Sequence, residues 1–170
     1  MPNKNTFTIK PIKELLARYT NKGVWVDPMA GNFSPAMCKN DIDKETNVET
    51  HKDATEYLKT FCIQSIDGVL FDPPYSPRQV SECYKKLGLT VNMETTQSSY
   101  WRKIKDEIDK VVKKGGYVIS FGWNSNGMGK TRGYEIVEIL LVAHGGNHND
   151  TICLIEKKIK MKICNHLFRK

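Results

Sequence analysis

A rigid turn in the middle of the chain carries the residues best suited to chemistry. Residues 68–71 form an apolar run typical of a buried strand, and Asp72, Pro73, Pro74 and Tyr75 follow it directly. Each proline fixes its own φ and favours an extended conformation of the residue before it, so Asp72 and Pro73 are held rigid. The Asp72 carboxylate and the Pro73 carbonyl would then be two fixed acceptors beside an aromatic face. We call these four residues the DPPY corner.

Two fixed acceptors suit the methylation of an exocyclic amine on a nucleic-acid base. Such an amine is a poor nucleophile because its lone pair is delocalised into the ring. Acceptors that hold its N–H groups favour a pyramidal nitrogen with a localised lone pair. The base must first leave the helix stack, and the Tyr75 ring could replace the lost stacking. The alternative is a proline-bounded turn that merely ends a strand.

The DPPY corner resembles motif IV of the S-adenosylmethionine-dependent amino-methyltransferases, in which D/N/S-P-P-Y/F/W grips the target amine. Residues 24–32 are similar to the D-P-F-x-G-x-G cofactor loop of that family, and residues 10–15 look like the K-P-x-x-L segment that precedes the loop. The resemblance is to small adenine-specific (N6) DNA methyltransferases of the phage and prophage type, and it implies S-adenosylmethionine as the cofactor. The cofactor-binding residues that we expect are Lys10, Pro11, Asp27, Pro28, Met29, Ala30, Gly31, Asn32, Asp41 and Asp53.

The cofactor loop departs from the family pattern at two positions. Met29 stands where the family has an aromatic residue, and Phe33 replaces the last glycine. Residues 33–36 must do the work of the usual crossover helix, so a helix dipole contributes little to cofactor binding. By position, Asp41 is the candidate for binding the cofactor ribose or amino-acid part, with Asp43 as the alternate. Asp53 would lie near the cofactor adenine. A turn or helix-capping role is the alternative for each aspartate.

The substrate contacts are expected in the segments that follow the strands. Residues 122–133 form a glycine-rich basic loop, which we expect to be mobile and to bring cations to phosphates. Trp123 or Met128 would pack on a flipped base. The predicted substrate-binding residues are Ser76, Arg78, Gln79, Trp123, Asn124, Lys130, Arg132 and His144, with Asn147 and Asn149 as further candidates. A metal site at His144 and His148 is the weaker reading of that turn, and no metal is predicted.

The element pattern predicts an α/β fold: a Rossmann-like class I methyltransferase sheet, mainly parallel with a C-terminal antiparallel hairpin, and helices on both faces. Ligands would bind beyond the carboxyl ends of its strands. The predicted helices are residues 11–19, 54–61 and 100–114, and the predicted strands are residues 24–26, 37–42, 48–52, 68–71, 117–123, 136–143 and 151–156. Residues 1–170 would form a single domain without a separate target-recognition domain, which leaves residues 76–99 and 122–133 to read sequence.

The bulk composition is compatible with a polyanionic partner. The 170 residues carry a net charge of +7, and the five cysteines form no C-x-x-C pair. No apolar run has membrane-spanning length, so we expect a cytoplasmic protein of a bacterial cell, phage- or prophage-encoded. The expected partner is double-stranded DNA with a flipped base, bound by a monomer or homodimer. Three alternatives remain: an RNA-base methyltransferase (adenine N6 or guanine N2), a protein amino-methyltransferase, and a catalytically weak binding subunit with this fold.

Overall fold

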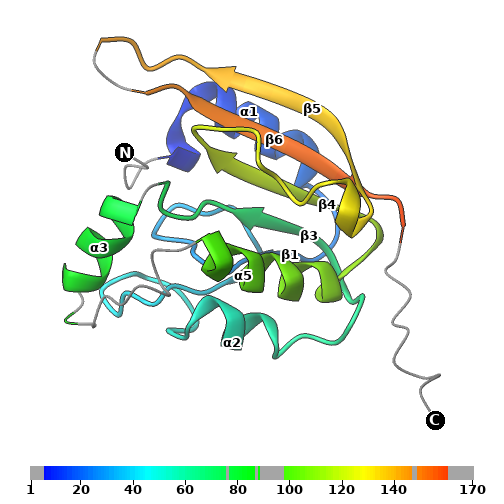
Figure 1. Ribbon diagram of the computed structural model, residues 1–170, viewed down its shortest axis with the longest axis horizontal. Helices are drawn as coiled ribbons and strands as arrows, with labels where there is room; N and C mark the ends of the chain where they lie inside the picture. The colour runs from blue at the N-terminus through cyan, green and yellow to red at the C-terminus, as the bar shows by residue number, and fades with distance from the viewer. Residues whose placement is uncertain (1–5, 76, 87, 89–97, 147–148, 161–170) are drawn as a thin grey trace.

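A six-stranded sheet with the strand order β2-β1-β3-β4-β6-β5 forms the centre of the molecule (Figure 1). The computed structural model describes residues 6–75, 77–86, 88, 98–146 and 149–160. The first four strands in this order are parallel, and β6 runs antiparallel to both of its neighbours. The strands are β1 (Trp25–Asp27), β2 (Cys38–Lys39), β3 (Ile66–Phe71), β4 (Val112–Gly122), β5 (Tyr134–Val142) and β6 (Thr151–Lys158).

Helices cover both faces of the sheet, as predicted. The helical elements are η1 (Thr6–Thr8), α1 (Lys10–Tyr19), α2 (Ala54–Leu58), α3 (Pro77–Lys86), α5 (Ser98–Val111) and η2 (Lys130–Arg132). Side chains alternate along each strand: Leu70 and Ile119 pack toward α1, whereas Val69 and Val118 pack toward α2 and α5. Figure 1 shows α1 on one side of the sheet and α2 and α5 on the other. The predicted α/β class and the C-terminal antiparallel hairpin are confirmed.

The parallel register brings the polar strand ends to one edge of the sheet. Val26 pairs with Val69, and Phe71 pairs with Ser120. The loop after β1, the DPPY corner after β3 and the loop after β4 therefore start at the same edge. The antiparallel pairing of Gly122 with Ile152 brings the start of β6 to that edge as well.

The predicted end of the long helix is wrong by three residues. The helix ends at Val111, and Val112 already belongs to β4 and pairs with Ile66. The register then shifts between Ile66 and Gly68, and Gly115 adopts a φ of +84° within this irregularity. This irregularity is a β-bulge in β4. The helix ends before it because the pairing of Val112 with Ile66 outweighs the helical pattern of the local sequence.

Other segments also differ from the prediction. The predicted strand at residues 48–52 is reduced to a single bridge between Asn40 and Thr50, and the strand predicted at residues 37–42 is reduced to the two residues of β2. Part of the segment that was expected to be free to read sequence, residues 76–99, forms the helix α3. The helix starts with Pro77, which is well suited to a first helical position.

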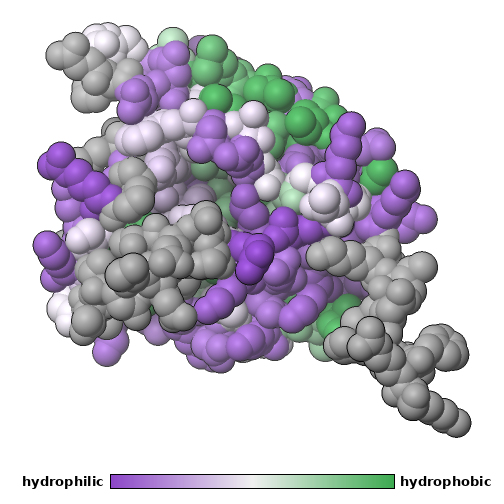
Figure 2. All heavy atoms as spheres, in the orientation of Figure 1, coloured by the Kyte–Doolittle hydropathy of each residue, from purple (hydrophilic) through white to green (hydrophobic). Residues whose placement is uncertain are grey.

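The edge strand β5 leaves one row of aliphatic side chains in solvent, visible as the hydrophobic band along β5 in Figure 2. These side chains belong to Ile136, Val137, Ile139 and Leu141, and each is at least half exposed. None of them lines the cavities described below. Within the described residues, no helix combines the length and the apolar character needed to cross a bilayer.

Candidate active site

Two cavities meet at the DPPY corner. The first has a volume of about 430 Å³ and extends from Asp72 along the loops that follow β1 and β2. The second has a volume of about 330 Å³ and lies between the DPPY corner, the end of β4 and α5. Pro74 and Trp101 line both cavities. The corner therefore separates two ligand-sized spaces that share a wall.

The DPPY corner is held by its own hydrogen bonds. The Tyr75 hydroxyl donates to Asp72 Oδ1 at 2.6 Å, and the Tyr75 backbone N–H donates to Gln79 Oε1 at 2.6 Å. The Tyr75 ring lies edge-on to the Trp123 ring, with 5.6 Å between centroids. Gln79, predicted as a substrate contact, is buried and braces the corner from the first turn of α3.

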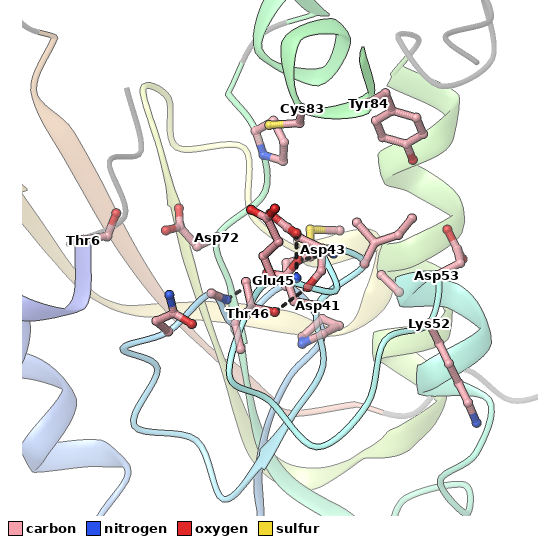
Figure 3. Close-up of a pocket in the computed structure, with 18 of the residues that line it drawn as sticks. Thr6, Asp41, Asp43, Glu45, Thr46, Lys52, Asp53, Asp72, Cys83 and Tyr84 are labelled. Carbon is pink, nitrogen blue, oxygen red and sulfur yellow. Dashed lines mark hydrogen bonds between the residues drawn. The ribbon is translucent and has the colours of Figure 1, made fainter. Parts of the chain in front are cut away.

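The Asp72 carboxylate is a poorly solvated acceptor. Burial raises the pKa of Asp72 to about 6, against the opposing effect of hydrogen bonds from the hydroxyls of Tyr75 and Thr6. The carboxylate lines the first cavity at the end nearest η1, and Figure 3 shows Thr6 beside it. The carboxylate thus stays ionised at neutral pH, as holding an amine requires, and its raised pKa also suits it to receive a proton.

The cofactor loop crosses from β1 to β2 without a helix, as predicted from its length. Residues 28–37 are turns and irregular backbone. Gly31 adopts a φ of +54°, and a Cβ placed on it would meet no atom within 4 Å. Its N–H donates to Asp41 Oδ2 at 2.9 Å. The Ala30–Gly31 backbone therefore stands open to the first cavity, and helix-dipole stabilisation is absent at this loop.

Asp27 supports the cofactor loop from behind. Its side chain is fully buried and accepts hydrogen bonds from the Met29 N–H at 3.0 Å and from the Ser34 hydroxyl at 2.6 Å. Burial raises the pKa of Asp27 to about 7, although both hydrogen bonds oppose the rise. Asp27 is not among the residues that line the first cavity, whereas Pro28, Met29, Ala30, Gly31 and Asn32 all line it. Asp27, predicted to bind the cofactor, therefore does not line this cavity and instead holds the loop that does.

Asn40 fixes the same loop from the sheet side. The side chain is fully buried; its amide donates to Pro28 O at 3.0 Å and to Lys52 O at 2.9 Å. Its Oδ1 accepts from the Lys52 N–H at 2.9 Å and from the Thr50 hydroxyl at 2.9 Å. Four hydrogen bonds from one side chain thus join the loop after β1 to the segment before α2. The sequence does not predict this role of Asn40, because no local pattern of residues indicates it.

A group of acidic side chains lines the first cavity. Figure 3 shows Asp41, Asp43 and Glu45 grouped there, with Thr46 among them. Both predicted candidates, Asp41 and Asp43, line the cavity, and sequence analysis missed Glu45 and Thr46. Asp53 lines the cavity as well, but its carboxylate also caps α2 through the Thr55 and Glu56 N–H groups, as the alternative interpretation held.

The predicted K-P-x-x-L segment, residues 10–15, does not line the first cavity. Lys10 and Pro11 are exposed at the start of α1 and do not line the first cavity. The N-terminal segment instead supplies Thr6 and Phe7 to its wall. The helix that Pro11 opens turns Ile12, Leu15 and Leu16 into the core, which positions η1 at the edge of the sheet.

The second cavity combines aromatic rings and cations. The predicted Trp123, Asn124 and Arg132 line it, together with Trp101, Arg102 and Lys105 from α5, which were missed. Arg132 is tied to Asp106 by an ion pair at 2.9 Å. Arg102 is exposed at the cavity. Cationic groups from α5 and η2 thus surround a space walled by Tyr75, Trp101 and Trp123.

The basic loop of residues 122–133, expected to be mobile, is anchored on two sides. The buried Glu156 carboxylate accepts hydrogen bonds from the Met128 N–H at 2.5 Å and from the Gly129 N–H at 2.9 Å. On the other side, Lys105 Nζ donates to Asn126 O at 2.7 Å and to Gly127 O at 2.9 Å. Met128 is itself buried, so it cannot pack on a base. The loop is a fixed wall of the second cavity.

Several predicted substrate contacts lie outside both cavities. Lys130 is exposed, and Arg78 pairs with Glu82 on the surface of α3. The His144 ring contacts the Thr151 hydroxyl at 2.7 Å, and His144 lines neither cavity. Asn149 lines neither cavity. Ser76, Asn147 and His148 lie outside the described residues. Among the residues that are described, no group of three or more His, Cys, Asp or Glu could hold a metal ion.

Comparison with known proteins identifies the fold. No protein-family model and no curated protein matches the chain in sequence. Among solved structures, the 1,6-didemethyltoxoflavin-N1-methyltransferase of Burkholderia thailandensis superposes with a TM-score of 0.60 at 10% identity, over 89% of this chain and 78% of that one. N-methyltransferase NodS from Bradyrhizobium japonicum WM9 gives 0.57 at 11% identity, over 93% and 90%. The putative methyltransferase yhhF of Escherichia coli gives 0.56 at 9%, over 90% and 88%.

The chain has the class I methyltransferase fold. The first two of these proteins were crystallised with S-adenosylhomocysteine. At these identities the similarity establishes the fold, and the chemistry has to come from the residues of the site itself.

Proposed function

We propose that this protein is an S-adenosylmethionine-dependent methyltransferase that acts on an exocyclic amine of a nucleic-acid base, with N6 of a flipped-out adenine in DNA as the target. The observation that carries the proposal is the position of the DPPY corner on the wall between the two cavities. Asp72 faces the first cavity, and Pro73 and Tyr75 face the second. A group held at the corner can therefore meet ligands from both sides.

The first cavity suits the cofactor in its volume and in the side chains and backbone groups that line it. A volume of about 430 Å³ lies within the usual range for cofactor sites. The open Ala30–Gly31 backbone would approach the methionine part, and the carboxylates of Asp41 and Asp43 offer acceptors for ribose hydroxyls. When bound, S-adenosylmethionine supplies an electrophilic methyl group, so no covalent enzyme intermediate is needed.

The corner residues would first activate the target amine and then accept the proton that it loses. An ionised Asp72 and the Pro73 carbonyl accept its two N–H groups and favour the localised lone pair that attacks the methyl carbon. Methyl transfer leaves the nitrogen positively charged, and that nitrogen must lose a proton. The Asp72 carboxylate can take this proton, since burial keeps its pKa at about 6.

The second cavity supports a nucleic-acid base over other amines. Its rings, Tyr75, Trp101 and Trp123, offer faces and edges to a planar group. Arg102 and Lys105 bring positive charge to the same space, as a phosphate backbone requires. The preference for adenine N6 in DNA rests on the resemblance of the DPPY corner, and an RNA base is the alternative target.

Two measurements test this proposal. Titration calorimetry should detect binding of S-adenosylmethionine and S-adenosylhomocysteine, and tritiated methyl groups should enter unmodified DNA or RNA. Asp72→Ala should abolish transfer and retain cofactor binding. Asp150→Ala, which removes a carboxylate outside both cavities, is the matched control. Undetectable cofactor binding would contradict the enzyme and favour a binding subunit with this fold.

A further inference from the structure

Thr6 contacts the central carboxylate from a distant part of the sequence. Its hydroxyl donates a hydrogen bond to the Asp72 carboxylate, and Thr6 is 5% exposed in the wall of the first cavity. Figure 3 shows the two side chains facing each other at one end of that cavity. A buried carboxylate is stabilised in its charged form by each hydroxyl that donates to it.

The segment that carries Thr6 is fixed independently of the DPPY corner. Phe7 is buried and lies edge-on to Phe121, with 5.4 Å between ring centroids. The Ile9 N–H donates to Thr6 O at 3.4 Å, and α1 follows with its apolar side in the core. The backbone that carries the Thr6 hydroxyl is therefore held by contacts of its own with β4 and α1.

Tyr75 is the other hydroxyl donor to Asp72, but its position differs. The Tyr75 hydroxyl donates to Asp72 Oδ1 at 2.6 Å, and its ring lines the second cavity, where the proposed base would lie. A target amine also has to donate to Asp72. The amine and Tyr75 thus approach the carboxylate from the side of the substrate, whereas Thr6 lines only the first cavity.

We propose that Thr6 is a positioning residue that holds the Asp72 carboxylate in the orientation from which it accepts the N–H group of the target amine. This inference rests on the proposed function of the DPPY corner. When the amine takes the place of the Tyr75 hydroxyl, the Thr6 hydrogen bond keeps one carboxylate oxygen fixed and the other available. It also keeps the carboxylate charged while ligands exclude water from both cavities.

The test compares Thr6→Val, which keeps the shape and removes the hydroxyl, with Thr6→Ser, which keeps the hydroxyl. Carbon-13 NMR of aspartate-labelled protein without ligands reports the pKa of Asp72 directly. We expect Thr6→Val to raise this pKa by roughly one pH unit, as the loss of one hydrogen bond to a charged group implies. Thr6→Ser should stay close to the unmodified protein. Thr8→Val, in the same η1 element but exposed, is the matched control.

Kinetics provide the second readout. Thr6→Val should move the acidic limb of kcat/KM for the nucleic acid to higher pH by the same amount and lower kcat/KM about twofold at pH 7, with KM for S-adenosylmethionine unchanged. Thr6→Ser should restore both values. If Thr6→Val does not fold, Thr6→Ala replaces it in both measurements.

The two proposals fail in different ways. An unchanged pKa of Asp72 in Thr6→Val or Thr6→Ala overturns the positioning role, whether or not the protein is active. An equal loss of kcat/KM at every pH that Thr6→Ser does not restore overturns the positioning role as well. A shifted pKa in a protein that binds no S-adenosylmethionine and transfers no methyl group counts against the proposed function alone.

Discussion

The Asp72 carboxylate must be ionised to accept the N–H groups of an amine, yet burial raises its pKa to about 6. Below that pH the carboxyl becomes protonated, and its O–H group replaces an acceptor that the amine needs. We therefore expect kcat/KM for the nucleic acid, which reports ionisations of the enzyme before it binds that substrate, to fall about tenfold for each pH unit below about 6. A pH profile between pH 5 and 8 checks this; a flat profile across pH 6 would contradict the role of an ionised Asp72.

The buried carboxyl of Asp27 leads to a prediction about the pH dependence of stability, not of activity. Its pKa is about 7 in the folded protein and near 4 when unfolded, so the folded state binds the proton more tightly between these values. The free energy of unfolding should therefore fall as pH rises from about 4 to about 7, with a contribution on the order of 3 kcal/mol from Asp27. Asp27→Asn should flatten this slope in denaturant titrations at pH 5 and 7.5, and an unchanged slope would contradict the assignment.

At the scale of elements, the loop after β1 depends on the Asn40 side chain. Asn40→Ala removes four hydrogen bonds and leaves the buried Pro28 carbonyl and the Lys52 backbone groups without this partner. We expect a loss of about 2–4 kcal/mol in the free energy of unfolding and at least tenfold weaker cofactor binding, since the loop lines the cofactor cavity. Denaturant titration and calorimetry measure the two effects. Asn47→Ala, at an exposed position, is the control.

The wall of the second cavity depends in the same way on Glu156. Glu156→Gln replaces one of the two acceptor oxygens that hold the Met128 and Gly129 N–H groups, at a cost of about 1–3 kcal/mol. Because this wall faces only the second cavity, nucleic-acid binding should weaken while cofactor affinity stays within a factor of two. Fluorescence anisotropy with a labelled oligonucleotide measures the first effect. The exposed Glu135→Gln should change neither quantity; a fall in cofactor affinity alone would contradict the separation of the two cavities.

The sequence predicts the features that are governed by local chemistry. The DPPY corner is predictable because prolines restrict their own neighbours, and the buried strand before it is a continuous apolar run. Thr6, Asn40 and Glu156 act through partners far away in the chain, so no local pattern identifies them. For the same reason the predicted helix of residues 100–114 extends three residues too far: the bulge at Gly115 follows from the pairing of β4 with β3, which a single segment does not reveal.

At the scale of the whole molecule, the net charge of +7 is useful only where cations gather near the site. Arg102 lies at the second cavity, whereas Arg18 lies on α1, on the other face of the sheet, and pairs with Glu138. If Arg102 contacts a phosphate, Arg102→Ala should weaken DNA binding and lower the dependence of log K on log salt by about one. Arg18→Ala should leave both unchanged. Equal effects of the two substitutions would contradict a nucleic-acid site at the second cavity.

The central claim is that Asp72 holds a base amine at the boundary between the two cavities. Its most direct test is nucleoside analysis of unmodified DNA and RNA after incubation with the protein and tritium-labelled S-adenosylmethionine. We expect labelled N6-methyladenine from DNA, lost in Asp72→Ala and retained in Asp150→Ala. Label in an RNA base would move the target to RNA and keep the role of the corner. Label on a carbon atom of a base, or methylation that persists in Asp72→Ala, would show that Asp72 does not hold a base amine.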